Sequence, residues 1–170
     1  MSAINVGAIG NLNELESLCD LSVRALDEII ELQDYPVKAA EVSTKSRRSL
    51  GIGYIGLAHY LAKNGVKYSD PKAWELVDRL SEAFQYYLLR ASCDIAQEKG
   101  KCEAFERTKY ADGLLPIDHY KKEVDEIVPH KQRMAWETLR KDIGKHGLRH
   151  STLSVSYTHL TLPTTPVVWV

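Results

Sequence analysis

The chain has 170 residues, of which 44% are apolar and 26% are charged, and its formal net charge is −1. This length and composition indicate one soluble globular domain with a single core. The balanced charge excludes a polycationic face for nucleic acid, and the sequence shows neither a membrane span nor a secretory signal. We therefore expect a cytoplasmic protein without nucleic-acid or membrane partners.

The first predicted helix follows a short apolar run. That run, residues 3–9, fits either a buried strand or a loop. Asn11 and Glu14 then resemble a capping box, and the sequence Asp-Tyr-Pro at 34–36 ends the segment. Between them apolar residues recur at helical spacing, which indicates an amphipathic helix. These residues are Leu15, Leu18, Cys19, Leu26, Ile29 and Ile30.

The glycine-rich segment 51–56 lies between a polar stretch and a second predicted helix. Its sequence, GIGYIG, has the GxGxxG spacing of dinucleotide-binding turns, in which a buried strand precedes the first glycine. Residues 43–49 are too polar to form that strand, so we interpret the glycines as positions of close backbone packing rather than a nucleotide site. The helix after them begins near Leu57 and ends near residues 64–65, Asn-Gly.

The clearest predicted element is a long helix. Asp70 is a typical cap, Pro71 suits the first helical position, and an apolar face continues to Gly100, which predicts about 29 residues of helix. Tyr86 and Tyr87 lie inside this helix. Because consecutive helical residues point about 100° apart, we place only Tyr87 on the apolar face and interpret the pair as core packing rather than a redox site.

The remaining predicted elements are shorter. A helix spans about residues 115–128, and another ends near Gly144 or Gly147. The apolar residues of this last helix are Trp136, Leu139 and Ile143. Residues 148–154 are compatible with a strand.

Few side chains suggest a ligand. His146 and His150 have the i, i+4 spacing of metal ligands, but a glycine at a helix end separates them, so no metal site is predicted. Lys45, Arg47 and Arg48 could meet a phosphate, although we prefer a solvated loop as the interpretation.

The cysteines are interpreted as reduced thiols, mostly in the core. Cys19, Cys93 and Cys102 are an odd number without CxxC spacing, which argues against a disulfide framework and a zinc ribbon. No serine or cysteine lies in a recognisable nucleophile motif.

Several stretches resemble, in family order, the large catalytic subunit of class I ribonucleotide reductase. They are SAINVGAI at 2–9, RRSLGIGYIGLAHYLAKNG at 47–65, YYLLRASCDIAQEKG at 86–100 and YADGLLPIDHYKK at 110–122. The most specific match runs from Trp136 to Ser154, where WETL and GLRHSTLS follow the family signature. Tyr54 departs from the family average in a way that packing can absorb.

The resemblance ends after Ser154. There the family pattern calls for a small residue and, three positions later, a proline that begins a phosphate-cradling loop, whereas this chain has Val155 and Thr158. All Lys, Arg, Asp and Glu residues precede position 150, and SYTHLTLPTT resembles translated sequencing-adapter read-through. We therefore expect residues 1–154 to be part of a catalytic barrel domain and residues 155–170 to be non-native. An evolved C-terminal segment is the alternative.

The resemblance implies an α/β fold, the ten-stranded α/β barrel of ribonucleotide reductase, of which this chain is a mostly helical internal fragment with a few short strands. It also implies an enzyme that reduces ribonucleoside diphosphates to deoxyribonucleoside diphosphates by thiyl-radical chemistry. Such an enzyme has nucleotide effectors, a large-subunit homodimer and a small subunit that holds the radical cofactor.

The fragment itself is expected to be inactive, because the family's radical and redox cysteines match no position of this chain. We therefore predict no catalytic, cofactor-binding or metal-binding residue, and only Met1 and Ser2 as substrate-adjacent, since a redox cysteine precedes the matching family segment. The competing hypothesis is a stand-alone helical protein-interaction module without catalysis.

Overall fold

The computed structural model describes residues 1–119, 122–126 and 131–154. The segment 155–170 lies outside these residues, as does the end of the predicted helix at 127–128. Within the described residues no helix is long and apolar enough to cross a membrane.

Three short stretches of extended backbone lie side by side in parallel. Strand β1 (Ser2–Asn5) pairs with β2 (Ile52–Ile55). On the other side of β2, Ser154 forms a parallel bridge with Ile52, and the Leu50 amide donates to the Thr152 carbonyl at 2.8 Å. Mostly helical chain connects these stretches, as parallel pairing requires. The prediction of a mostly helical fragment with a few short strands is confirmed.

Helix α1 (Glu14–Leu32) begins two residues later than the capping pattern suggested. Asn11 and Glu14 do pair, since Asn11 Nδ2 donates to Glu14 Oε1 at 3.3 Å, but Asn11 stands in the turn before the helix. The buried face includes a charged residue, Asp27, whereas Ile29, one of the apolar residues that indicated the helix, is 52% exposed. The buried residues of α1 are Leu15, Cys19, Val23, Asp27 and Ile30.

The polar stretch after α1 forms a helix, α2 (Lys38–Arg47), that the sequence pattern did not predict. None of its residues is buried, so it has no apolar stripe to reveal it. Glu41 instead pairs with Lys38 at 2.9 Å and with Lys45 at 3.1 Å along one side of the helix. After β2 comes the short helix α3 (Leu57–Lys63), close to its predicted bounds.

Helix α4 (Pro71–Lys99) has the predicted start, end and length of 29 residues. Helix α5 (Trp136–His146) ends before Gly147, the second of the two predicted ends. Between them the described residues form three 3-10 turns, η1 (Phe105–Arg107), η2 (Pro116–Asp118) and η3 (Lys122–Glu126). The continuous helix predicted over 115–128 is therefore wrong.

Turn η2 does not continue as a helix because the Asp118 side chain bonds both to its own turn and to α5. The Asp118 carboxylate accepts a hydrogen bond from the Leu115 amide at 2.7 Å and pairs with Arg140 of α5 at 2.8 Å. These contacts tie η2 to α5 instead of extending it.

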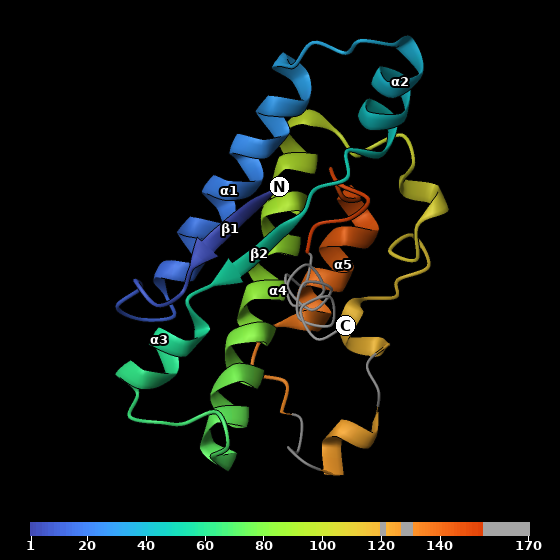
Figure 1. The fold of residues 1–170 in the computed structure, drawn as a ribbon. Helices are drawn as coiled ribbons and strands as arrows, with labels where there is room; N and C mark the ends of the chain where they lie inside the picture. Colours follow the sequence, from blue (N-terminus) through green and yellow to red (C-terminus); the bar gives the residue numbers. More distant parts are fainter. Residues whose placement is uncertain (120–121, 127–130, 155–170) are drawn as a thin grey trace, which may run out of the picture.

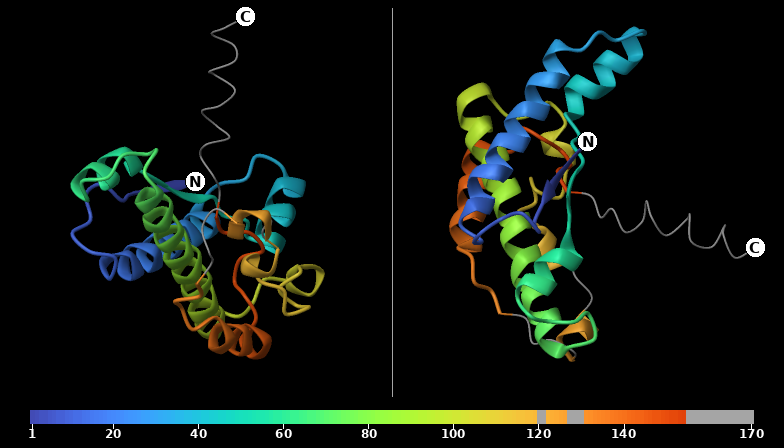
Figure 2. Two further views of the ribbon diagram at one scale, coloured as in Figure 1. Left: turned by 90° about the horizontal axis from the view of Figure 1, so that it is seen from below. Right: turned by 60° about the vertical axis from the view of Figure 1, so that its left-hand side comes forward.

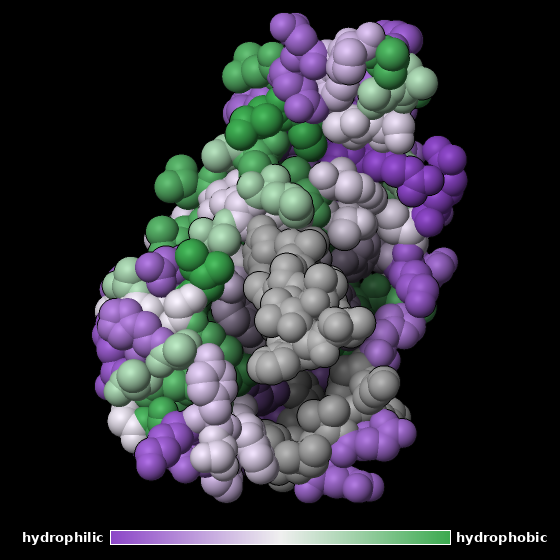
Figure 3. All heavy atoms as spheres, in the orientation of Figure 1, coloured by the Kyte–Doolittle hydropathy of each residue, from purple (hydrophilic) through white to green (hydrophobic). Residues whose placement is uncertain are grey.

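The helices form a layer against one face of the strands. Helix α1 packs mainly against α4, and α4 also packs against α5. Strands β1 and β2 lie together beside this layer (Figures 1 and 2). Apolar side chains also reach the surface over α1 and the strands (Figure 3), among them Leu21, Ile29, Leu32 and Ile55.

Candidate functional site

A buried ionic cluster joins three segments that are far apart in the sequence. Asp27 lies on the buried face of α1, Arg48 follows α2, and His150 follows α5. Arg48 donates from Nε and Nη2 to Asp27 Oδ1 at 2.8 and 2.6 Å, and His150 Nε2 lies 3.0 Å from the same oxygen. All three residues are buried. We refer to these residues, with Ser92, as the Asp27 cluster.

Arg48 reaches Asp27 because the chain turns sharply at the end of α2. Its φ is 47°, a left-handed conformation that costs a non-glycine residue about 1–2 kcal/mol. The turn leaves Arg48 only 3% exposed, and Glu31 accepts a further hydrogen bond from its Nη1. The hydrogen bonds to Asp27 and Glu31 offset this strain, and the predicted solvated loop is wrong for Arg48.

The hydrogen bonds of His150 assign its neutral tautomer. The backbone amide of His150 donates to Ser92 Oγ at 3.2 Å, and the same oxygen lies 2.9 Å from His150 Nδ1. The ionised carboxylate of Asp27 can only accept, so the ring hydrogen of a neutral His150 lies on Nε2 and is donated to Asp27. Nδ1 then carries no hydrogen and accepts from the Ser92 hydroxyl.

Ser92, His150 and Asp27 thus have the connectivity of a Ser-His-Asp triad. All three are fully buried, and none lines the cavity between Arg47 and Leu114 or the cavity beside Glu82. Because a nucleophile must reach a substrate, this arrangement acts as a structural link between α1, α4 and residues 148–154.

Burial and hydrogen bonding set the charge states of the cluster. Burial, the larger effect, lowers the pKa of His150 although Asp27 favours the protonated ring. Burial alone would raise the pKa of Asp27, but hydrogen bonds from His150 and Arg48 outweigh it and hold that pKa well below its usual range. At neutral pH Asp27 is ionised and His150 is neutral.

Further charges surround the cluster. Arg149 Nε lies 3.5 Å from Asp27 Oδ1, and Lys99 Nζ lies 3.7 Å from Oδ2. Lys99 also pairs with Glu28. With a neutral His150, the three cations balance the three carboxylates, so the cluster together with its partly exposed charged neighbours carries no net charge. The residues counted are Arg48, Lys99 and Arg149 against Asp27, Glu28 and Glu31.

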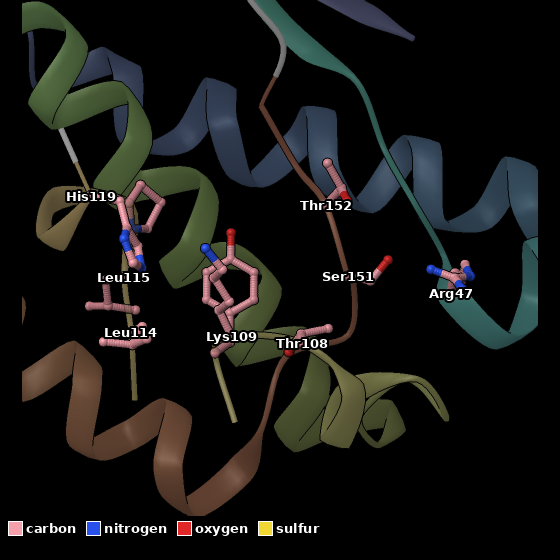
Figure 4. Close-up of a pocket in the computed structure, with 10 residues that line it drawn as sticks. Arg47, Thr108, Lys109, Leu114, Leu115, His119, Ser151 and Thr152 are labelled. Atoms are coloured by element: carbon pink, nitrogen blue, oxygen red, sulfur yellow. The ribbon is translucent and has the colours of Figure 1, made fainter. Parts of the chain in front are cut away.

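A cavity of about 310 Å³ opens beside the cluster, at the amino ends of β2 and of residues 152–154. Leu114, Leu115, Lys109 and His119 lie on one side of it, and Ser151, Thr152 and Arg47 on the other (Figure 4). Thr108, Tyr110 and Pro116 complete the lining. Arg47 and Ser151 adjoin Arg48 and His150 in the sequence, so the Asp27 cluster holds this side of the cavity in place.

A second buried carboxylate organises the entry to α5. Glu82 Oε1 accepts hydrogen bonds from the amide of Arg133 at 2.7 Å and from the indole of Trp136 at 3.0 Å. Burial alone would raise its pKa, but these hydrogen bonds outweigh it, so the pKa of Glu82 is lowered. Glu82 also lines a cavity of about 290 Å³ with Arg79 and Tyr87.

The sequence pattern did not reveal the buried polar residues Asp27, Glu82 and Ser92. One signal was present, because Asp27 continues the buried series Leu15, Cys19 and Val23 at intervals of four residues. A carboxylate in an apolar stripe requires a cationic partner. That partner is Arg48, which lies 21 residues away, and local spacing does not identify it.

The glycine segment does not form a nucleotide-binding turn. Gly51 precedes β2 and Gly53 lies inside it, whereas a dinucleotide fingerprint needs the strand before the first glycine. Gly56 follows the strand with φ of 79°, and a Cβ there would clash with Asn5 Oδ1. Close backbone packing, the preferred interpretation, is confirmed at Gly56.

The tyrosine pair packs in the core, but one prediction about it is wrong. Tyr86 and Tyr87 are both half-buried against the core, so the apolar environment is not confined to Tyr87. The Tyr86 ring meets Trp136 edge to face at 5.3 Å and Tyr87 at 5.7 Å.

The two histidines do not share a helix face. His146 is the last residue of α5, and both ring nitrogens of His150 are engaged by Ser92 and Asp27. Of the cations considered with them, Lys45 pairs with Glu41 on α2, and Arg47 lines the cavity.

The cysteines are buried thiols, as predicted. Burial raises the pKa of Cys19 to about 12 and that of Cys93 to about 11, and it also raises the pKa of Cys102. Met1 is 81% exposed, and the amide of Ser2 donates to the Gly51 carbonyl at 2.9 Å where β1 begins. The substrate-adjacent role of these two residues stays a prediction.

Comparison with known proteins gives consistent matches. Residues 1–157 match the family model described as ribonucleotide reductase, barrel domain. The chain is 55% identical over 154 residues to the ribonucleoside-diphosphate reductase subunit alpha of Buchnera aphidicola from Schizaphis graminum, and 56% identical over 154 residues to that of Haemophilus influenzae. Each alignment covers 91% of this chain and 20% of the relative.

The ribonucleoside-diphosphate reductase 1 subunit alpha of Escherichia coli K12 is 53% identical over 125 residues, which cover 74% of this chain and 16% of that protein. The chain thus spans about a fifth of the length of the curated relatives it matches. On the family match and these identities, the chain belongs to the ribonucleotide reductase barrel-domain family.

Proposed function

We propose that this chain is a segment of the α subunit of a ribonucleoside-diphosphate reductase and forms part of the wall of a ten-stranded α/β barrel. The observation that carries the proposal is 53–56% identity to proteins of that name. The parallel alignment of β1, β2 and residues 152–154, with α1 and α4 packed together beside the strands, agrees with a barrel wall.

The complete protein, on this proposal, reduces ribonucleoside diphosphates to deoxyribonucleoside diphosphates in the cytoplasm. Its partners are a second α subunit and a small subunit whose radical cofactor supplies the oxidising equivalent, and nucleotides act as effectors. The segment described here contributes structure, because its three thiols are buried and protonated and so unsuited to redox exchange. Met1 and Ser2 are proposed to adjoin the substrate region.

We also propose that residues 1–154 are the barrel part and that residues 155–170 are not native. The family match ends at residue 157, which supports a boundary in this region. Amplifying the gene from its source tests the boundary. A reading frame that continues into the family's proline is expected, whereas a genomic sequence that encodes SYTHLTLPTT would contradict the proposal.

The behaviour of the isolated chain separates a barrel segment from a stand-alone interaction module. The exposed apolar residues Leu21, Ile29 and Leu32 of α1 should bind a hydrophobic dye or cause self-association in a barrel segment. Dye fluorescence and light scattering of the purified chain measure this, with a reductase assay alongside. A dye-silent monomer that unfolds cooperatively would favour the module, and deoxynucleotide formation by the chain alone would refute the structural role.

A further inference from the structure

The cavity beside the Asp27 cluster is lined by two cationic side chains that form no ion pair with a carboxylate. Arg47 and Lys109 line it, and its lining includes no Asp or Glu among the residues that the structure describes. Within the described residues, ion pairs engage Arg48, Lys99 and Arg149 around the cluster, but none engages Arg47 or Lys109. Unpaired cations in a concave site attract an anion.

The side of the cavity that carries Arg47 is built before any ligand arrives. The Ser151 amide donates to the Arg47 carbonyl at 3.0 Å, and the hydroxyls of Ser49 and Ser151 lie 3.0 Å apart. The next residues inward, Arg48 and His150, are fixed by their hydrogen bonds to Asp27. A ligand held here would therefore not have to order the backbone that binds it.

The opposite side supplies an apolar wall and additional hydrogen-bonding groups. Leu114, Leu115 and Pro116 provide apolar surface, and Lys109 and His119 stand beside them (Figure 4). Burial raises the pKa of Tyr110, so its hydroxyl remains a potential donor at neutral pH. A cavity of about 310 Å³ admits a small molecule, and the chain's net charge of −1 does not favour a nucleic-acid backbone.

We propose that this cavity binds a small organic phosphate. Lys109 and Arg47 hold the phosphate by charge-assisted hydrogen bonds, and the organic part lies against Leu114 and Pro116. The site is independent of the proposed reductase function, because it is formed by residues of this chain alone.

Calorimetric titration of the full 170-residue chain with phenyl phosphate and with inorganic phosphate tests the proposal. Phenyl phosphate should bind more tightly, because only it uses the apolar wall. Lys109→Gln and Arg47→Gln should each weaken both probes about tenfold, the effect of one charge-assisted hydrogen bond. Leu114→Ala should weaken phenyl phosphate alone, and this residue is exposed enough, at 37%, for the fold to tolerate the change.

Lys141→Gln is the matched control, since Lys141 is an exposed cation of α5 that does not line the cavity. It should leave both affinities unchanged, and circular dichroism verifies the helical fold of every variant. Equal loss in Lys141→Gln, unchanged binding in Lys109→Gln, or no binding of either probe by the folded chain would overturn the proposal. If the isolated chain does not hold its helical fold, the same titrations in a full-length α subunit carrying residues 1–154 decide the outcome.

Discussion

Replacing Asp27 by asparagine should destabilise the protein far more than removing an exposed carboxylate from the same helix. The substitution conserves volume but leaves the buried Arg48 without its main counter-charge, and Arg48 Nε, Arg48 Nη2 and His150 Nε2 all donate to Asp27 Oδ1. Breaking a buried ion pair from one side costs about 3–5 kcal/mol. We expect about 3 kcal/mol, the lower end of that range, because Glu31 still accepts from Arg48.

Urea unfolding followed by far-ultraviolet circular dichroism measures this loss. With a slope of about 2 kcal/mol/M, the midpoint should fall by about 1.5 M. Asp20→Asn is the matched control, because the Asp20 side chain is 42% exposed and pairs with Arg24 on the same helix at 3.0 Å. An exposed pair of this kind contributes about 0.3–0.5 kcal/mol, so the control midpoint should move by about 0.2 M.

A double-mutant cycle shows whether the loss arises from the ion pair. Arg48→Met should also destabilise the chain. The double variant with Asp27→Asn and Arg48→Met should lose less stability than the sum of the two single losses, because it leaves no buried charge of this pair without a partner. Equal midpoint shifts for Asp27→Asn and Asp20→Asn, or strictly additive losses in the cycle, would refute the reasoning.

Three further predictions concern pH, thiol reactivity and backbone strain. Burial lowers the folded-state pKa of His150 below the unfolded value of about 6.5. The stability that the neutral, buried ring contributes is therefore fully present above that pH and is lost as the pH falls through the folded-state pKa. The urea midpoint should therefore drop less between about pH 7 and pH 5.5 in His150→Gln, and an equal drop would contradict this. With a pKa of about 12, Cys19 should react with a thiol reagent only as fast as the chain unfolds; rapid labelling of the native protein near pH 8 would show otherwise. Gly56→Ala should lower the melting temperature more than Gly65→Ala does, since both have positive φ but only Gly56 lacks room for a Cβ; equal shifts would rule out the close contact with Asn5.

The elements predicted correctly are those whose ends and apolar faces are both visible in the sequence. Helix α4 begins at Pro71 after Asp70 and ends before Gly100, and between these signals a single apolar face faces the core. Helix α2 offered neither signal. Its residues are all at least partly exposed, and the ion pairs of Glu41 with Lys38 and Lys45 run along its side, so hydrophobic periodicity could not reveal it.

The hydrogen-bond partners of the buried polar residues could not be predicted from the sequence, for a physical reason. Arg48 lies in a charged run that normally indicates a solvated segment, yet a left-handed turn buries it against a carboxylate 21 residues earlier. Likewise, Glu82 accepts hydrogen bonds from residues 133–136, more than fifty positions away. Such partners are set by how α1, α4 and α5 pack, which local spacing does not encode.

The cavity lining illustrates the same division. Arg47 was identified as a candidate phosphate contact from its charge, but Lys109 and His119 were not, because they reach the same cavity only through the fold. The family resemblance compensated for part of this gap. It indicated the family from blocks such as 47–65 and 136–154, which meet where the Leu50 amide donates to the Thr152 carbonyl.

Reductase activity of a chimera tests the central claim most directly. In a full-length α subunit of the family, such as that of Haemophilus influenzae, residues 1–154 of this chain would replace the matching segment, which is 56% identical over 154 residues. If these residues form part of the reductase barrel wall, the chimera should fold and convert ribonucleoside diphosphates to deoxyribonucleoside diphosphates when the small subunit is supplied. A soluble, folded chimera that forms no deoxynucleotide would contradict the account.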